Sequence, residues 1–258
     1  MNKVSAIASV VIKELIRRKD FYVLFVLTGL ITLLMASISL FKEDDALRGI
    51  QEICLLLIWI SGLAIALGTA ARQIPAERES RTIFPLLAKP VTRAQVVLGK
   101  FLGCWLACGG ALAVFYLSFW IMSASREHEW HVMNYFLSFW MQWMFLGIVI
   151  AMTLLGSLIF AAPSSNATIV LVVVVGILLL GRDFKLVATG LPKLMSLGVY
   201  VIYFIIPQLW FFDVREMVAQ HRALEWQYCG LASLYAMAYI GIFLTATWLF
   251  FRRKALQT

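Results

Sequence analysis

Six stretches of this chain are apolar over about 19 residues or more with almost no charge inside them, and this limits the fold more than any other feature. A helix rises about 1.5 Å per residue, so about 20 residues cross the roughly 30 Å hydrocarbon core of a bilayer. Of the 258 residues, 62% are apolar and only 14% are charged. The strands of an outer-membrane barrel would alternate in polarity, and these runs do not. The sequence therefore predicts an all-α membrane protein.

The apolar runs give the positions of six expected transmembrane helices, and a further run complicates the count. A seventh apolar run, residues 194–212, is long enough to cross as well. The six spans are expected at residues 21–41, 53–71, 101–122, 135–162, 165–181 and 228–251.

Charge placement favours six spans over seven. With six, the pieces on the side of the two chain ends hold fourteen basic and four acidic residues, and the opposite pieces hold eight basic and ten acidic residues. Because Lys and Arg are retained on the cytoplasmic side during insertion, both ends are expected in the cytoplasm. A seventh span would place Arg252, Arg253 and Lys254 outside. Pro207 also interrupts the seventh run, so we expect a re-entrant hairpin in the outer loop, residues 182–227.

An amphipathic pattern precedes the first span. Within residues 1–20, Val4, Ile7, Val11 and Leu15 recur at helical spacing, and four of the last eight residues are basic. This pattern is typical of an elbow helix that lies in the membrane interface. The alternative is a helical extension of the first span.

The connection between the fourth and fifth spans is very short and uncharged. Pro163 is expected to end one helix, and Ser164 or Ser165 could cap the next. The two helices should then be antiparallel neighbours.

The sequence contains no pattern that predicts catalysis or metal binding. No ionisable residue lies in the middle of any span, and Gln142, the most polar candidate, is expected to hydrogen-bond a neighbouring helix. The motifs of zinc proteases, serine hydrolases and phosphate-binding loops are missing. Cys104 with Cys108, and His128 with His131, have spacings that permit a metal, but packing and a solvated loop are the favoured interpretations. We therefore predict no catalytic residue and no metal site, and an energy source must come from another protein.

The most informative polar segment joins the second and third spans, at residues 72–95. Its middle, residues 83–87, is apolar between charged flanks, and such a patch is too hydrophobic to face water alone. Thr92 and Gln95 then form a T-x-x-Q capping box, which predicts a helix that begins there and runs through Met122.

At these residues the chain resembles a permease of the ABC-2 type, the membrane subunit of a class of ATP-binding-cassette transporters. The family pattern has an acidic cluster, a Gly-Thr pair, a Leu-rich turn, a Pro followed by Ser or Thr and Arg, and then Gly-Lys-Phe. Here Glu77-Arg-Glu-Ser-Arg-Thr82 is followed by Pro90-Val-Thr-Arg93 and by Leu98-Gly-Lys-Phe101. The chain departs from this pattern at Arg81, where the family usually has Gly, and a more continuously helical backbone is expected there. A second family-like feature is the outer hairpin, with Pro207, Trp210 and Asp213.

The resemblance implies a single permease domain, residues 1–258, with a cytoplasmic coupling helix that sits in a groove of a separate ABC ATPase subunit. ATP and Mg would bind that partner and not this chain. Twelve helices per transporter imply a homodimer or heterodimer of permeases, with the substrate path between them and no role for nucleic acid. We expect this chain in the inner (plasma) membrane of a bacterial cell. The residues expected to contact the ATPase are Glu77, Arg78, Glu79, Ser80, Arg81, Thr82, Ile83, Phe84, Leu86 and Leu87.

Three functional classes follow from these features. The favoured class is a permease subunit that exports an amphiphilic or hydrophobic substrate. The second is a membrane anchor or assembly subunit that recruits an ATPase without transporting anything. The third, an intramembrane enzyme, is disfavoured because the spans lack a polar core.

Overall fold

The computed structural model describes residues 3–17, 26, 29, 44–75, 92–127, 132–160, 162–181, 206–219 and 225–254. This part of the chain is helical and contains no strand. Its elements are α1 (Lys3–Arg17), α3 (Asp44–Ala70), α6 (Arg93–Glu127), α7 (Val132–Ile159), α8 (Pro163–Leu180), the 3-10 helix η1 (Leu209–Phe212), α11 (Arg215–Ala219) and α12 (Trp226–Lys254).

Five of these helices, α3, α6, α7, α8 and α12, are long and apolar enough to cross a membrane. Each contains all or most of one predicted span, from the second to the sixth. The predicted first span, residues 21–41, lies outside the described residues except for Val26 and Gly29, which are both helical. The all-α class is therefore confirmed for the part of the chain that the structure describes.

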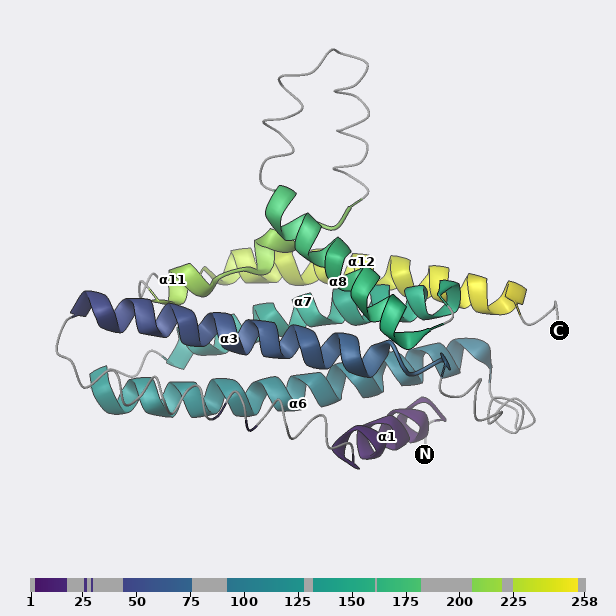
Figure 1. The fold of residues 1–258 in the computed structure, drawn as a ribbon, viewed down its shortest axis with the longest axis horizontal. Coiled ribbons are helices and arrows are strands. Elements are labelled where there is room, and N and C mark those ends of the chain that lie inside the picture. The colour runs from purple at the N-terminus through teal and green to yellow at the C-terminus, as the bar shows by residue number, and fades with distance from the viewer. Residues whose placement is uncertain are drawn as a thin grey trace, which may run out of the picture.

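The long helices α3, α6, α7 and α12 lie side by side along the long axis of the molecule, and α8 crosses this bundle obliquely (Figure 1). The chain runs in opposite directions in α3 and α6, and reverses again in α7. α7 lies at the centre and packs against α3, α6, α8 and α12. Its fully buried side chains include Phe145, Ile148 and Ile150, and Phe145 stacks on Trp59 of α3 with ring centroids 4.8 Å apart.

A reciprocal pair of tryptophans joins α6 to α7. Trp105 Nε1 donates to the backbone oxygen of Trp143, and Trp143 Nε1 donates to the backbone oxygen of Trp105, each over 3.0 Å. The two rings stack with centroids 4.6 Å apart. Each indole also lies over a glycine of the opposite helix, Gly109 for Trp143 and Gly147 for Trp105. A side chain at either glycine would occupy the place of the ring, so these residues set the distance between the helices.

The amphipathic helix α1 packs against the first turns of α6. Its residues Ala8, Val11 and Leu15 are buried there. Two glycines one turn apart on α6, Gly99 and Gly103, let the helices approach closely, because a Cβ atom at either position would lie 2.7 Å from a Cβ atom of α1. α1, which was predicted as an elbow helix, thus packs against α6, a partner that the sequence did not indicate. Whether α1 continues into the first span lies outside the described residues.

The start of α8 differs from the prediction. Ala162 is the N-cap residue and Pro163 is the first helical residue, so Ser164 and Ser165 lie inside the first turn and cap nothing. The capping prediction was wrong because proline, which lacks an N–H group, is well suited to the first helical position itself. Helices α7 and α8 were expected to be antiparallel neighbours, and they are neighbours: Asn166 is buried against Gly156 and its Nδ2 donates to the Thr153 oxygen over 3.0 Å. α8 crosses the bundle obliquely, however, so the two helices are not strictly antiparallel.

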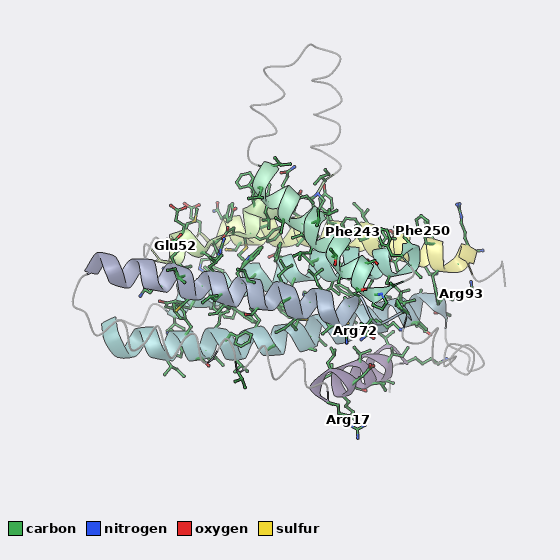
Figure 2. The ribbon with its side chains drawn as sticks, in the orientation of Figure 1. Arg17, Glu52, Arg72, Arg93, Phe243 and Phe250 are labelled. Carbon is green, nitrogen blue, oxygen red and sulfur yellow. The ribbon has the colours of Figure 1, made fainter. Side chains whose placement is uncertain are left out.

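Charged residues mark the two ends of the bundle. Arg17, Arg72 and Arg93 lie toward one end, and Glu52 lies toward the other (Figure 2). α1 and the end of α12 lie at the arginine side, whereas α3 begins at the opposite end. The end of α1 and the start of α3 therefore lie toward opposite ends of the bundle.

Candidate functional site

The sequence selected two regions: the flanks of the first lie at the arginine end of the bundle, and the second, in the outer loop, lies at the other end. The residues predicted to contact an ATPase, within residues 77–87, lie outside the described residues. Their flanks are described: the turn that follows α3 and the start of α6 lie at the arginine end. The structure therefore shows what holds this segment at its two ends.

The start of α6 has the predicted capping box. The Gln95 N–H donates to Thr92 Oγ1 over 3.4 Å, and the Thr92 N–H donates to Gln95 Oε1 over 3.1 Å. The two side chains satisfy backbone donors that a helix start leaves without partners. The helix that follows runs for 35 residues to Glu127. Its length of roughly 50 Å exceeds the roughly 30 Å of hydrocarbon, so its first turns extend beyond the apolar layer.

Lys100, in the second turn of α6, binds the turn that follows α3. Its side chain is buried, with 2% of its surface exposed, and its Nζ donates to the backbone oxygen of Gln73. Gln73 lies in the turn after α3 and is also buried. A buried ammonium group needs a hydrogen-bond partner, and the backbone oxygen of Gln73 supplies one.

Arg93, the first residue of α6, makes the same kind of contact with α12. Its Nη1 donates to the backbone oxygen of Arg252 over 2.9 Å and lies 3.4 Å from the oxygen of Phe251. Its guanidinium carbon also lies 5.9 Å from the centre of the Phe251 ring. Two cations from the start of α6 thus bind backbone carbonyl groups in the turn after α3 and in the last turn of α12. The sequence placed Arg93 and Lys100 among the cytoplasmic charges but gave no sign of these contacts, which depend on helices distant in the chain.

The second region is the outer loop, where Pro207, Trp210 and Asp213 were selected. Residues 206–208 are not helical and η1 follows them, so residues 194–212 do not form one continuous helix. Trp210 Nε1 donates to Gln208 Oε1 over 3.2 Å, and the Gln208 N–H donates to the Tyr235 hydroxyl over 2.7 Å. The first part of the predicted hairpin, residues 194–205, lies outside the described residues.

Asp213 forms an ion pair with Arg215 at this end of the bundle. Arg215 donates from Nε and Nη2 to the two carboxylate oxygens, over 2.7 and 2.8 Å. Its guanidinium carbon lies 5.2 Å from the centre of the Trp59 ring. Burial of the guanidinium lowers its pKa, but the hydrogen bonds and negative charge of Asp213 outweigh this and raise the pKa of Arg215 above its ordinary value. The cation thus anchors α11 to α3 and stays charged.

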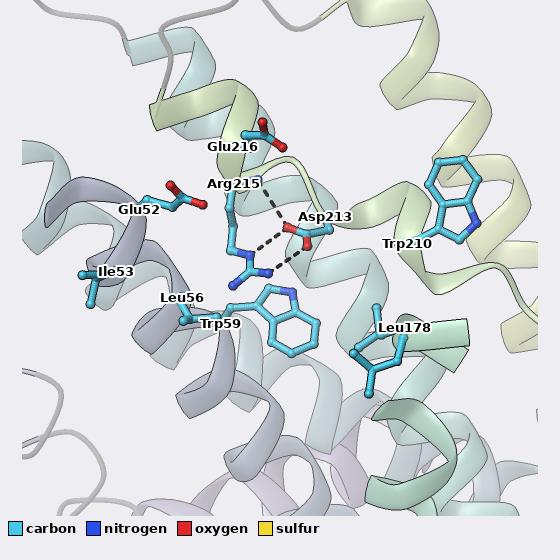
Figure 3. A pocket seen from close by; sticks show the side chains of 10 residues that line it. Glu52, Ile53, Leu56, Trp59, Leu178, Trp210, Asp213, Arg215 and Glu216 are labelled. Atoms are coloured by element: carbon cyan, nitrogen blue, oxygen red, sulfur yellow. Dashed lines mark hydrogen bonds and ion pairs between the residues drawn. The ribbon is translucent and has the colours of Figure 1, made fainter. Parts of the chain in front are cut away.

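An open cavity of about 440 Å³ lies around this ion pair, between α3, α8 and the outer loop (Figure 3). Its wall combines charged and apolar groups from separate elements. The lining includes Glu52, Trp59, Leu178, Trp210, Asp213 and Arg215.

Polar side chains in the interior of the bundle form hydrogen bonds between helices. Gln142 Oε1 accepts from the Tyr116 hydroxyl over 2.9 Å, and Gln142 Nε2 lies 3.4 Å from the backbone oxygen of Ile58. The prediction that Gln142 bonds to neighbouring helices is confirmed. Cys104 and Cys108 are both buried, and no group of three or more potential metal ligands occurs in the described ranges. His128 and His131 lie outside them.

Comparison with known proteins gives one clear result. The family model described as "ABC-2 family transporter protein" matches residues 4–255. No curated protein matches the chain.

Proposed function

Because this chain belongs to the ABC-2 family of transporter proteins, we propose that it is the permease subunit of an ATP-driven exporter. The observation that carries the proposal is the extent of the family match. It begins at the second residue of α1 and continues beyond the end of α12, so it includes nearly the whole described bundle. The proposed substrate is amphiphilic or hydrophobic.

In this proposal the chain crosses the inner (plasma) membrane of a bacterial cell six times, with both ends in the cytoplasm. Five span-length helices support it, and so do the positions of α1 and of the start of α3, which lie toward opposite ends of the bundle. The arginine end, where α1 and the end of α12 lie, corresponds to the cytoplasmic side.

Energy comes from a separate cytoplasmic ATPase that binds ATP and Mg and contacts residues 77–87. The apolar residues Ile83, Phe84, Leu86 and Leu87 would anchor the contact, and the charges of Glu77, Glu79 and Arg81 would orient it. The proposal is supported by the position of the flanks: the capped start of α6 and the turn after α3 lie together at the arginine end. A second permease chain would complete the transporter, with the substrate path between the two.

The test is co-purification of the tagged chain from its native membrane. We expect it to bring down a protein that contains G-x-x-x-x-G-K-[ST], the phosphate-binding loop of an ATPase. The reconstituted complex should hydrolyse ATP, and mass measurement should show two permease chains. Isolation of the chain without any nucleotide-binding partner, under conditions that preserve its fold, would contradict the proposal.

A further inference from the structure

The base of α6, defined here as Arg93, Lys100 and the two glycines Gly99 and Gly103, contacts three other helices at the arginine end. Lys100 binds the turn that follows α3, Arg93 binds the end of α12, and the two glycines pack closely against α1. The same eleven residues, 93–103, thus connect α6 with helices that precede and follow it in the chain. All of these contacts lie beside the two ends of the segment proposed to bind the ATPase.

We infer that Lys100 and Arg93 are positioning residues that transmit movement of the coupling segment to α3 and α12. The inference rests on the proposed function, because it concerns how the ATPase signal enters the bundle. Neither residue needs to contact the ATPase or the substrate.

The geometry of Lys100 supports this role. Its ammonium group is buried and donates to the backbone oxygen of Gln73. This contact joins the turn before the coupling segment to α6, the helix after the segment. Moving a buried charge into the membrane without a partner is costly, so the ammonium group and the Gln73 carbonyl should move together. A shift of the segment therefore moves the end of α3 with α6.

The geometry of Arg93 extends the connection to α12. Its guanidinium holds the carbonyl groups of Phe251 and Arg252 at the last turn of α12 and also contacts the Phe251 ring. Arg93 directly follows Thr92, whose capping contact fixes the start of α6. A rotation of α6 about its axis would thus pull on the ends of α3 and α12 from two sides.

A spin-label experiment on the complex with its ATPase tests the inference. The four native cysteines are replaced by alanine, and labels are attached at Ile53→Cys on α3 and Gln227→Cys on α12, near the outer end and distant from the base. Distances are measured with and without ATP plus vanadate. The wild-type background should show a second distance when nucleotide is trapped, and the two populations give an equilibrium constant.

Lys100→Met and Arg93→Met remove the donors and keep most of the apolar volume. Mutations in a coupling network change coupling by about 0.5–2 kcal/mol. We therefore expect the equilibrium constant between the two distance populations, measured with trapped nucleotide, to fall roughly 2- to 30-fold. The distances without nucleotide and the yield of bound ATPase should stay unchanged. Lys100→Arg, which retains the charge and the donors, should keep part of the nucleotide-dependent shift in distance. The matched control is Lys13→Met, the same change on an exposed lysine of α1.

The outcomes separate the inference from the proposed function. If both variants are folded and shift as fully as the wild type, Lys100 and Arg93 do not transmit the movement and the inference is overturned. If Lys100→Met fails to fold, the distances measured in Arg93→Met test the inference, because Arg93 is only half-buried. If the wild-type chain neither binds an ATPase nor responds to nucleotide, the proposed function fails and the inference fails with it.

Discussion

At the scale of single residues, Gly156 lies where α7 and α8 pack closely together. A Cβ atom at this position would collide with the side-chain oxygen of Asn166, which is buried between α7 and α8. We predict that Gly156→Ala lowers the free energy of unfolding by about 1–3 kcal/mol, the usual cost of overpacking a filled site. Thermal unfolding of the purified chain in detergent measures the change.

The control for this prediction is Gly176→Ala on α8, where no atom lies within 4 Å of the added Cβ. That variant should be neutral or gain up to about 1 kcal/mol, because alanine favours a helix more than glycine does. Equal destabilisation by the two substitutions would mean that contact with Asn166 does not determine the cost.

Polar residues in the spans show which individual roles a sequence can predict. Gln142 was expected to bond to neighbouring helices, since an amide in hydrocarbon needs a partner, and it does. The capping box of Thr92 and Gln95 is also as predicted, because its contacts are local. Lys100 was assigned only a side of the membrane, because its contact with Gln73 depends on how two helices pack. Local chemistry can thus be read from sequence, and contacts between distant elements cannot.

At the scale of elements, α1 packs closely against two glycines of α6. Gly99 and Gly103 form the surface of α6 that receives Ile7 and Val11. We predict that the double change Gly99→Ala and Gly103→Ala displaces α1 and raises its amide hydrogen exchange by about tenfold or more, since about 1.4 kcal/mol is a factor of ten in an opening equilibrium. Hydrogen-exchange mass spectrometry of the α1 peptides gives the readout.

The same substitution at Gly110, farther along α6 with open space around it, serves as the control. Exchange of α1 should remain at the wild-type rate in Gly110→Ala. An α1 that stays equally protected in the double variant would show that the close approach to α6 is not what holds it.

The span-length helices could be predicted because their signal is length and apolar content, which need no tertiary information. Their ends were less certain: α3 begins at Asp44, nine residues before the predicted start, because a helix can continue past the hydrocarbon into polar sequence. The start of α8 was misplaced for a local reason, since Pro163 occupies the first turn itself. The oblique course of α8 and the place of α1 depend on packing between elements and left no pattern in the sequence.

For the whole molecule, the decisive surface is the proposed contact with the ATPase. We predict that Phe84→Asp combined with Leu87→Asp abolishes co-purification of the ATPase while the permease still inserts. Burying an unpaired carboxylate at an apolar contact costs several kcal/mol, and about 1.4 kcal/mol is already tenfold in affinity. Arg81→Gln should have a smaller effect, because a rim charge mainly changes the association rate and its salt dependence.

Two Asp substitutions at the start of α7, at Val132 and Met133, are the control for that experiment. Both residues are exposed at the start of α7, at the opposite end of the bundle. The complex should remain intact in this variant. Full ATPase association by the Phe84 and Leu87 double variant would rule out the coupling role of residues 77–87.

The direction of the whole bundle in the membrane gives the last prediction. α1, the start of α6 and the end of α12 share one end of the molecule, and that end carries Arg17, Arg72 and Arg93. Positive residues are retained on the cytoplasmic side, so Lys254 should be inside and Glu225, before α12, should be outside. In a cysteine-free background of intact cells, an impermeant thiol reagent should label Glu225→Cys but label Lys254→Cys only after the membrane is opened. Labelling of Lys254→Cys from outside, with Glu225→Cys protected, would invert the bundle and place residues 77–87 where no cytoplasmic ATPase could reach them. If both positions were labelled from outside, α12 would not cross the membrane, and the six-span arrangement would be wrong.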